Sequence, residues 1–390
     1  MQQLPKRLLS IDVLRAVTMF LMIFVNESNG VKNVPLWIDH AEASADAMGF
    51  ADTIFPAFLF IVGLSLPFAI NNKIKKGESF ISILLYILTR SAALLIIGFY
   101  HVNLEDYSPA ATLPKAVWAL TITFSFFLIW LDYPEAMNKT KKYIFIGTGI
   151  LLLIIMAVIY KGGSAEATTW MRPSWWGILG IIGWSYLVCA ILYLISKGKL
   201  SLLILFWIIF AAINIAVHMG ILQGPIWLIG DGAPVTLTMG GIVISGIYAW
   251  LTGIGKTQRL WAIFTVLGLT LIAAGLFVRP FAGGISKIHS TPAWVFICSG
   301  ITILFFELAI YLIDIQGKKD WFKWIAPAGT STLTCYLMPY FQVFIMRLFH
   351  VHYPLFLNTG AAGLIRSFAI SFILIALVGL MEKRRIRLKL

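Results

Sequence analysis

The chain has 390 residues, of which 59% are hydrophobic and 12% charged, and its mean hydropathy is +0.88. Soluble domains carry about 25% charged residues, so this composition excludes a soluble globular protein and indicates an integral membrane protein. The net charge of +13 does not indicate nucleic-acid binding, because the basic residues are spread over short loops between apolar runs. The three cysteines lie inside apolar runs without the spacing of a metal or redox site, so we expect them to serve packing.

The apolar runs, taken in chain order, predict an all-α fold. A helix that crosses a hydrocarbon core of roughly 30 Å needs about 20 apolar residues, which predicts a polytopic transmembrane helix bundle of about 11–12 spans. The candidate spans lie near residues 8–26, 51–71, 79–100, 114–131, 143–160, 175–196, 200–218, 235–252, 260–278, 293–315, 325–349 and 361–381. The weakest are 114–131, 235–252 and the proline-containing 325–349. We expect residues 1–390 to form a single domain without an internal repeat.

The basic residues of the loops predict the orientation. Lys6 and Arg7 precede the first run as in a signal peptide, but no small-residue cleavage site follows, so we expect a retained first span. The positive-inside rule then places both termini in the cytoplasm. The opposite loops carry only Lys32, Lys115, Lys161, Arg172, Arg279 and Lys287. The same topology places all six histidines at or beyond the outer ends of spans, so proton-transfer chemistry would face outward.

A polar loop between the first two spans holds the best candidate for chemistry. The stretch from Asn26 to Gly63 has one histidine, His40. An imidazole with an ordinary pKa of about 6.5 can accept a proton near neutral pH. The carboxylates near it in sequence, which could orient or charge it, are Asp39, Glu42, Asp46 and Asp52. Capping the second span is an alternative role for Asp52.

Charged residues inside the spans need partners, because an ionised side chain at mid-bilayer costs about 2.5–3.5 kcal/mol on insertion scales. Asp12 and Arg15 are close enough on one helix to pair, although Arg15 could instead line a path for an anionic ligand. Arg90 has no carboxylate within a helical turn, and Glu307 is a candidate partner across the bundle. Among the outer aromatic residues, Trp37 is either an interfacial belt residue or a surface on which a sugar ring stacks.

The chain resembles the heparan-α-glucosaminide N-acetyltransferase family of multi-pass membrane acetyltransferases and its bacterial relatives. The resemblance lies first in three N-terminal segments, SIDVLRAVTMFLMIFVN, DHAEAS and ADTIFPAFLFIVGLSLPFAI. Further matches are SWWGILGIIGWSYLVCAI, GGISKIHSTPAW and YLID followed by APAGTSTLTCYL. The sequence departs from the family pattern at Ala16, where glycine is usual, and at Ser286, where asparagine usually precedes the lysine.

The resemblance implies a function and a set of site residues. The family moves an acetyl group from cytoplasmic acetyl-CoA to the amino group of a terminal glucosamine on the far side of the membrane. His40 then takes the place of the catalytic histidine, as general base or transient acetyl carrier, and Asn26 could donate to the oxyanion. The expected residues are catalytic His40, Asn26 and Asp52, donor-binding Arg15, Arg90 and Lys287, and acceptor-binding Trp37, Asp39 and His289.

The resemblance also sets the expected partners. They are acetyl-CoA as co-substrate without a metal, an amino-sugar acceptor and membrane lipid, but no nucleic acid, and a homodimer stays open. We expect a transmembrane acyltransferase of a bacterial cytoplasmic (inner) membrane. The alternatives are a transporter of a sugar or lipid-linked sugar, an O-acetyltransferase of cell-surface glycans, and a membrane scaffold. The lack of related halves disfavours a transporter, and the isolated intramembrane charges disfavour a scaffold.

Overall fold

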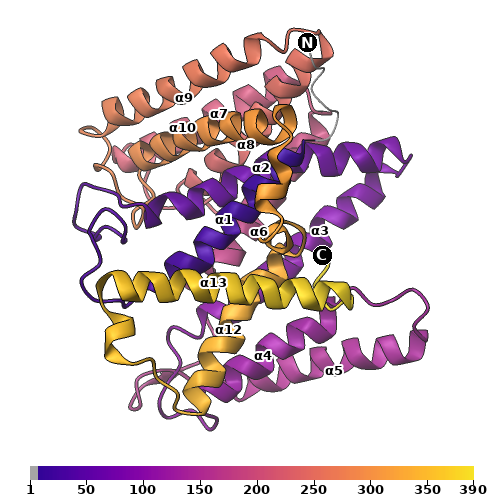
Figure 1. The fold of residues 1–390 in the computed structure, drawn as a ribbon, viewed down its shortest axis with the longest axis vertical. Coiled ribbons are helices and arrows are strands. Elements are labelled where there is room, and N and C mark those ends of the chain that lie inside the picture. Colours follow the sequence, from indigo (N-terminus) through magenta and orange to yellow (C-terminus); the bar gives the residue numbers. More distant parts are fainter. Residues whose placement is uncertain (1–7) are drawn as a thin grey trace.

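The computed structural model describes residues 8–390, and within them the protein is an all-α helix bundle (Figure 1). The helices are α1 (Leu9–Ser28), α2 (Ala51–Lys75), α3 (Phe80–Val102), α4 (Lys115–Trp130), α5 (Lys139–Val158), α6 (Gly177–Ile195), α7 (Leu200–His218), α8 (Ala233–Gly253), α9 (Arg259–Val278), α10 (Pro292–Ala309), α11 (Ala326–Thr330), α12 (Thr332–Leu348) and α13 (Gly360–Lys383). A π-helical turn extends α10 over Ile310–Ile315, and 3₁₀ turns cover Lys318–Phe322 and Leu355–Asn358. Two short antiparallel strands, β1 (Gly162–Gly163) and β2 (Thr168–Thr169), lie between α5 and α6.

The predicted fold class is confirmed. Every predicted span forms a helix, and in residues 8–390 ten helices are long and apolar enough to cross a membrane. The protein is therefore an integral, multi-pass membrane protein. Two of the three weakest predicted spans give shorter helices, since α4 has 16 residues and α12 has 17, and the helical run of 325–349 is interrupted at Ser331. The signal-peptide question rests on Lys6 and Arg7, which lie outside the described residues.

Loops that the topology prediction assigns to the outer side contact one another. Most helices run across the view in Figure 1, and the α1–α2 loop lies at the opposite edge from the α2–α3 turn. The α1–α2 loop contacts the α9–α10 loop through the Asp46–Arg279 ion pair, whose closest atoms are 2.9 Å apart. The same loop contacts the segment before α13, where the Lys32 N–H donates to the Asn358 carbonyl at 2.9 Å. The α1–α2 loop, the α9–α10 loop and the segment before α13 are therefore connected to one another.

Glycines allow the central helices to approach closely. A Cβ atom added to Gly63 of α2 would collide with the Thr238 carbonyl of α8, and one added to Gly98 of α3 would collide with the Gly180 amide of α6. Small residues at such crossings let helix backbones pack against each other in a bilayer. The apolar windows of α2 and α8 are 61% and 67% buried, against 17% for α5. Helices α2 and α8 thus lie in the centre of the bundle, and α5 presents most of its surface outward.

Candidate active site

Three predicted site residues meet at the outer end of α2, although they come from distant parts of the chain. His40 lies in the α1–α2 loop, Asp52 in the first turn of α2, and Lys287 in the α9–α10 loop. His40 Nδ1 is 2.6 Å from Asp52 Oδ1. Lys287 Nζ is 3.1 Å from the same ring nitrogen and 3.7 Å from the same carboxylate oxygen. These contacts define a cluster of an imidazole, a carboxylate and an ammonium group.

The Asp52 carboxylate holds the loop against the helix and orients His40. Its side chain is only 2% exposed, and Oδ2 accepts hydrogen bonds from the Ala41 N–H at 2.9 Å and the Gly49 N–H at 3.0 Å. Its main-chain carbonyl accepts from Trp294 Nε1 at 3.0 Å. The carboxylate thus binds two loop amides and the imidazole, so helix capping is not its whole role. Gly49 is required here, because a Cβ atom at that position would collide with a loop carbonyl.

The short contact to Asp52 determines which nitrogen of His40 can accept a proton. A buried carboxylate 2.6 Å from Nδ1 is favourable only if Nδ1–H donates to it. The neutral ring then keeps its lone pair on Nε2, a tautomer that we infer from the hydrogen-bond geometry. Lys287 adds positive charge beside the carboxylate. Burial lowers the pKa of Lys287, and the charge of Asp52 opposes that shift.

An outer cavity of about 510 Å³ contains this cluster. Asn26, in the last turn of α1, lines it together with His40 and Lys287, while Asp52 lies behind His40. Most of the remaining wall is apolar and comes from α1, α2, α6 and α10. Its other lining residues are Met22, Val25, Ala51, Ile54, Phe55, Trp175, Ile178, Ile181, Ile288, Ser290 and Trp294.

The three predicted acceptor-binding residues lie near the cavity without lining it. Trp37 is on the α1–α2 loop with its side chain 71% exposed. Asp39 supports His40 from behind, because its carboxylate accepts the His40 backbone N–H at 2.7 Å. His289 is exposed, and its carbonyl is 2.7 Å from His218 Nε2. Contact with an acceptor therefore remains a prediction for these residues.

A second cavity of about 410 Å³ lies towards the other face and is lined by both predicted intramembrane arginines. Arg15 donates to Ser65 Oγ at 2.5 Å and to the Gly329 carbonyl at 3.2 Å, and lies 3.4 Å from Asp12. Arg90 donates to the Tyr86 hydroxyl at 3.1 Å and packs 5.3 Å from the centre of the Tyr186 ring.

The suggested pairing of Arg90 with Glu307 is wrong. Glu307 accepts from Thr265 of the adjacent helix α9 at 3.0 and 3.1 Å, whereas the groups that contact Arg90 are tyrosines of α3 and α6. The error arose because the sequence does not reveal which helices are neighbours. Arg90 Nε is buried and has no hydrogen-bond partner among the described residues.

The two cavities lie along the same three helices. Arg15, Met19 and Met22 of α1 line the inner cavity, and Met22 and Asn26 line the outer one. Their spacing of three or four residues puts them on one face of the helix. Helices α2 and α6 line both cavities in the same way. The two cavities therefore follow one another along these helices, and the buried Met22 side chain belongs to the lining of both.

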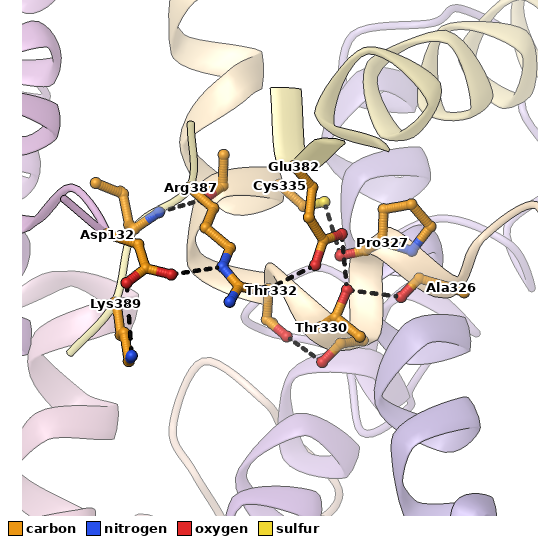
Figure 2. Close-up of polar contacts among 12 residues, drawn as sticks. Asp132, Ala326, Pro327, Thr330, Thr332, Cys335, Glu382, Arg387 and Lys389 are labelled. Carbon is orange, nitrogen blue, oxygen red and sulfur yellow. Dashed lines mark hydrogen bonds and ion pairs between the residues drawn. The ribbon is translucent and has the colours of Figure 1, made fainter. Parts of the chain in front are cut away.

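The C-terminal segment contributes Leu388, Lys389 and Leu390 to the lining of the inner cavity. Figure 2 shows the polar contacts around this segment. Arg387 lies between Asp132 and Glu382, with 3.0 Å contacts to each, and Glu382 in turn accepts from the Thr330 hydroxyl at 3.0 Å. Lys389, which lines the cavity, is 3.5 Å from Asp132. Sequence reasoning missed these contacts. It also missed Tyr86, although a residue four positions before Arg90 on a helix is a natural partner.

The fold and site define an integral multi-pass membrane protein with a potential base, His40, in its outer cavity. Within residues 8–390, no group of three or more His, Cys, Asp and Glu side chains is placed to hold a metal ion. Comparison with known proteins gives a match to part of the chain. A family model described as "Heparan-alpha-glucosaminide N-acetyltransferase, catalytic" matches residues 7–108, which confirms the resemblance of this part of the chain.

Two curated relatives each match about a quarter of the chain. The human heparan-alpha-glucosaminide N-acetyltransferase is 36% identical over 100 residues, and the mouse protein of that name is 33% identical over 97 residues. These segments cover 26% and 25% of this chain and 14% of each relative. The family match includes Asn26, His40 and Asp52 but not Lys287.

Proposed function

We propose that the protein is a transmembrane acetyltransferase. It transfers an acetyl group from cytoplasmic acetyl-CoA to the amino group of a glucosamine-type sugar on the outer, periplasmic side of a bacterial inner membrane. One observation carries the proposal. His40 is oriented by Asp52 inside an outer cavity that shares the lining residue Met22 with an arginine-lined inner cavity. Such an arrangement suits two substrates that approach from opposite faces.

The reaction requires a base, because an amine attacks a thioester only when it is unprotonated. The acceptor nitrogen bonds to the acetyl carbon, the carbon–sulfur bond breaks, and the thiolate leaves and takes up a proton. His40 Nε2 accepts the proton that the amine loses, and Asp52 stabilises the resulting imidazolium through Nδ1–H. General-base catalysis of this kind contributes about 10²–10⁴-fold.

Asn26 supplies a hydrogen-bond donor to the cavity that contains His40. Its amide lines the outer cavity one turn beyond Met22. Negative charge develops on the carbonyl oxygen of the thioester as the amine adds. A donor placed for that charge contributes about 10²–10³-fold. We assign this role to Asn26, whether the acetyl group passes directly to the amine or first to His40.

The inner cavity fits the charged part of the donor. Coenzyme A carries phosphate groups, and Arg15 and Arg90 present positive charge to this cavity. The buried, unpartnered Nε of Arg90 is a donor that a phosphate oxygen would satisfy. Lys73, in the last turn of α2, lies nearby, with its ammonium 4.3 Å from the centre of the Tyr86 ring and 3.0 Å from the Glu78 carboxylate. The positive-inside distribution makes this face cytoplasmic.

Acetyl transfer by the purified protein tests the proposal. Labelled acetyl-CoA is incubated with a panel of amino sugars, muropeptide fragments and sugars that lack an amine. We expect product with amino sugars, its loss in His40→Ala, and its retention in a control, His352→Ala, because His352 lies exposed in the α12–α13 loop. Transfer only to hydroxyl acceptors would indicate an O-acetyltransferase. Uptake into vesicles that survives His40→Ala, without any acetyl transfer, would indicate a transporter.

A further inference from the structure

Lys287 brings an amine of the protein itself into the outer cavity. Its Nζ lies 3.1 Å from His40 Nδ1, and its side chain is 25% exposed within the lining. The acceptor amine must approach the same imidazole to react. The lysines of the other outer loops, Lys32, Lys115 and Lys161, are not among the described lining residues of this cavity. Lys287 is therefore the lysine best placed to compete with the acceptor.

The backbone of the α9–α10 loop holds Lys287 in this position from two sides. On one side Asp46 accepts from the Ile285 N–H at 2.6 Å, and this hydrogen bond, with Arg279, lowers the pKa of Asp46. On the other side Asn214 donates to the Ser290 carbonyl at 3.2 Å. The backbone is thus fixed, whereas a lysine side chain keeps four carbons of flexible stem on which its amine can turn.

The chemistry of Lys287 is that of the acceptor. Both the acceptor and lysine present a primary amine, and each must lose its ammonium proton before it can attack a thioester. Burial favours the unprotonated amine of Lys287, since it lowers the pKa of the group, while Asp52 acts in the opposite direction. The unprotonated form of this amine would then compete for the donor whenever the acceptor is missing.

We propose that Lys287 is a site of self-acetylation, which switches the protein off when donor is present without acceptor. The inference rests on the proposed acetyl transfer and adds a regulatory modification to that site. Nζ, turned on its flexible stem to the Nε2 side of the ring, bonds to the acetyl carbon, the carbon–sulfur bond breaks, and the thiolate of coenzyme A leaves. The proton lost from Nζ passes through His40 Nε2 to the thiolate. The amide product is neutral and stable, so the positive charge that faces Asp52 is lost.

Mass spectrometry of the purified protein tests the proposal. The protein is incubated with labelled acetyl-CoA in detergent, with and without glucosamine, and the peptides that contain Lys287, Lys32 and Lys161 are quantified over time. We expect acetylation of Lys287 to approach one group per chain without glucosamine, to slow at least tenfold with it, and to be lost in His40→Ala. Lys32 and Lys161, which lie exposed in outer loops, should stay unmodified.

A preincubation experiment tests the regulatory part. Wild-type protein kept with acetyl-CoA alone should lose transfer activity in proportion to the acetylated fraction of Lys287. Lys287→Arg keeps the charge without an acylatable amine, so whatever initial rate it shows should survive the same preincubation.

Several results would overturn the proposal. The first is acetylation of glucosamine by a wild-type protein in which Lys287 stays unmodified after incubation with acetyl-CoA alone. The second is acetylation of Lys287 in His40→Ala to the same extent as in the wild type. The third is transfer of the label from acetylated Lys287 to glucosamine that is added later. Absence of any transfer to glucosamine or the other acceptors would instead contradict the proposed function itself.

Discussion

The replacement Asp52→Asn should remove most of the activity without unfolding the protein. Asp52 Oδ2 accepts from Ala41 and Gly49 at 2.9 and 3.0 Å, and the asparagine carbonyl can keep both hydrogen bonds. Its NH₂ group must then point at His40 Nδ1, where Oδ1 lies 2.6 Å away in the wild type. The imidazole responds by placing its proton on Nε2, which can no longer accept the proton of the amine.

The expected loss follows from this tautomer. A histidine held in the wrong tautomer by such a replacement costs about 10⁴-fold in kcat, or about 5 kcal/mol of transition-state stabilisation. Initial rates of acetyl transfer at saturating donor and acceptor measure this loss, and the thermal midpoint and elution volume check the fold. The matched control is Asp39→Asn, since Asp39 contacts only the backbone N–H of His40 among the interactions described above. It should change kcat by no more than about tenfold.

Two results would refute this reasoning. The first is an Asp52→Asn protein that keeps more than about a tenth of the wild-type kcat, which would place the loss below the range for general-base catalysis. The second is an equal loss in Asp39→Asn, which would show that the α1–α2 loop tolerates no neutral amide and that the tautomer is not the cause.

Three further changes test the cluster, the inner cavity and the helix packing. Because burial lowers the pKa of Lys287, its ammonium is lost as pH rises through a value below the ordinary 10.4 or so, and activity should fall at that pH. In Lys287→Arg the alkaline limb of the pH–rate profile should shift to higher pH. An unshifted limb would contradict a role for the Lys287 charge in activity. Arg90→Gln should raise KM for acetyl-CoA about tenfold or more with a smaller effect on kcat, whereas Arg172→Gln, on an outer loop, should leave KM unchanged in the same assay. Gly63→Ala should lower the thermal midpoint, because the added Cβ atom would collide with α8. In the control, Gly147→Ala, the added Cβ atom has no neighbour within 4 Å, so the midpoint should stay the same or rise. Equal midpoints would show that α2 and α8 can separate at no cost.

Much of the fold could be predicted because hydropathy and length act locally. The predicted spans coincide with helices, including the run 235–252, which was among the weakest and forms the well-buried α8. The interruption at Ser331 could not be predicted, because it depends on what α11 and α12 pack against. Hydropathy also does not reveal which helices are neighbours, and this is why Glu307 was matched with the wrong partner.

The site was predictable to different degrees. His40 and Asp52 are 12 positions apart, so their contact follows readily from sequence proximity. Lys287 is 247 positions from His40, and only the family resemblance suggested that it belongs to the site. Arg15 and Arg90 stood out because buried charge is costly, yet the cavity that explains them requires the packed bundle. Trp37 is only three positions from His40 in the sequence, yet it is exposed and does not line the outer cavity.

The ionic contacts of Arg387 have a consequence for how the protein responds to its surroundings. Asp132, at the end of α4, and Glu382, at the end of α13, are tied by one guanidinium, although neither α4 nor α13 contributes a lining residue to the inner cavity. Charges accessible to water are screened over about 8 Å at physiological ionic strength. Concentrated salt should therefore weaken this tie and loosen residues 388–390 from the wall of the inner cavity, so the ionic strength on that face would control how readily a ligand enters.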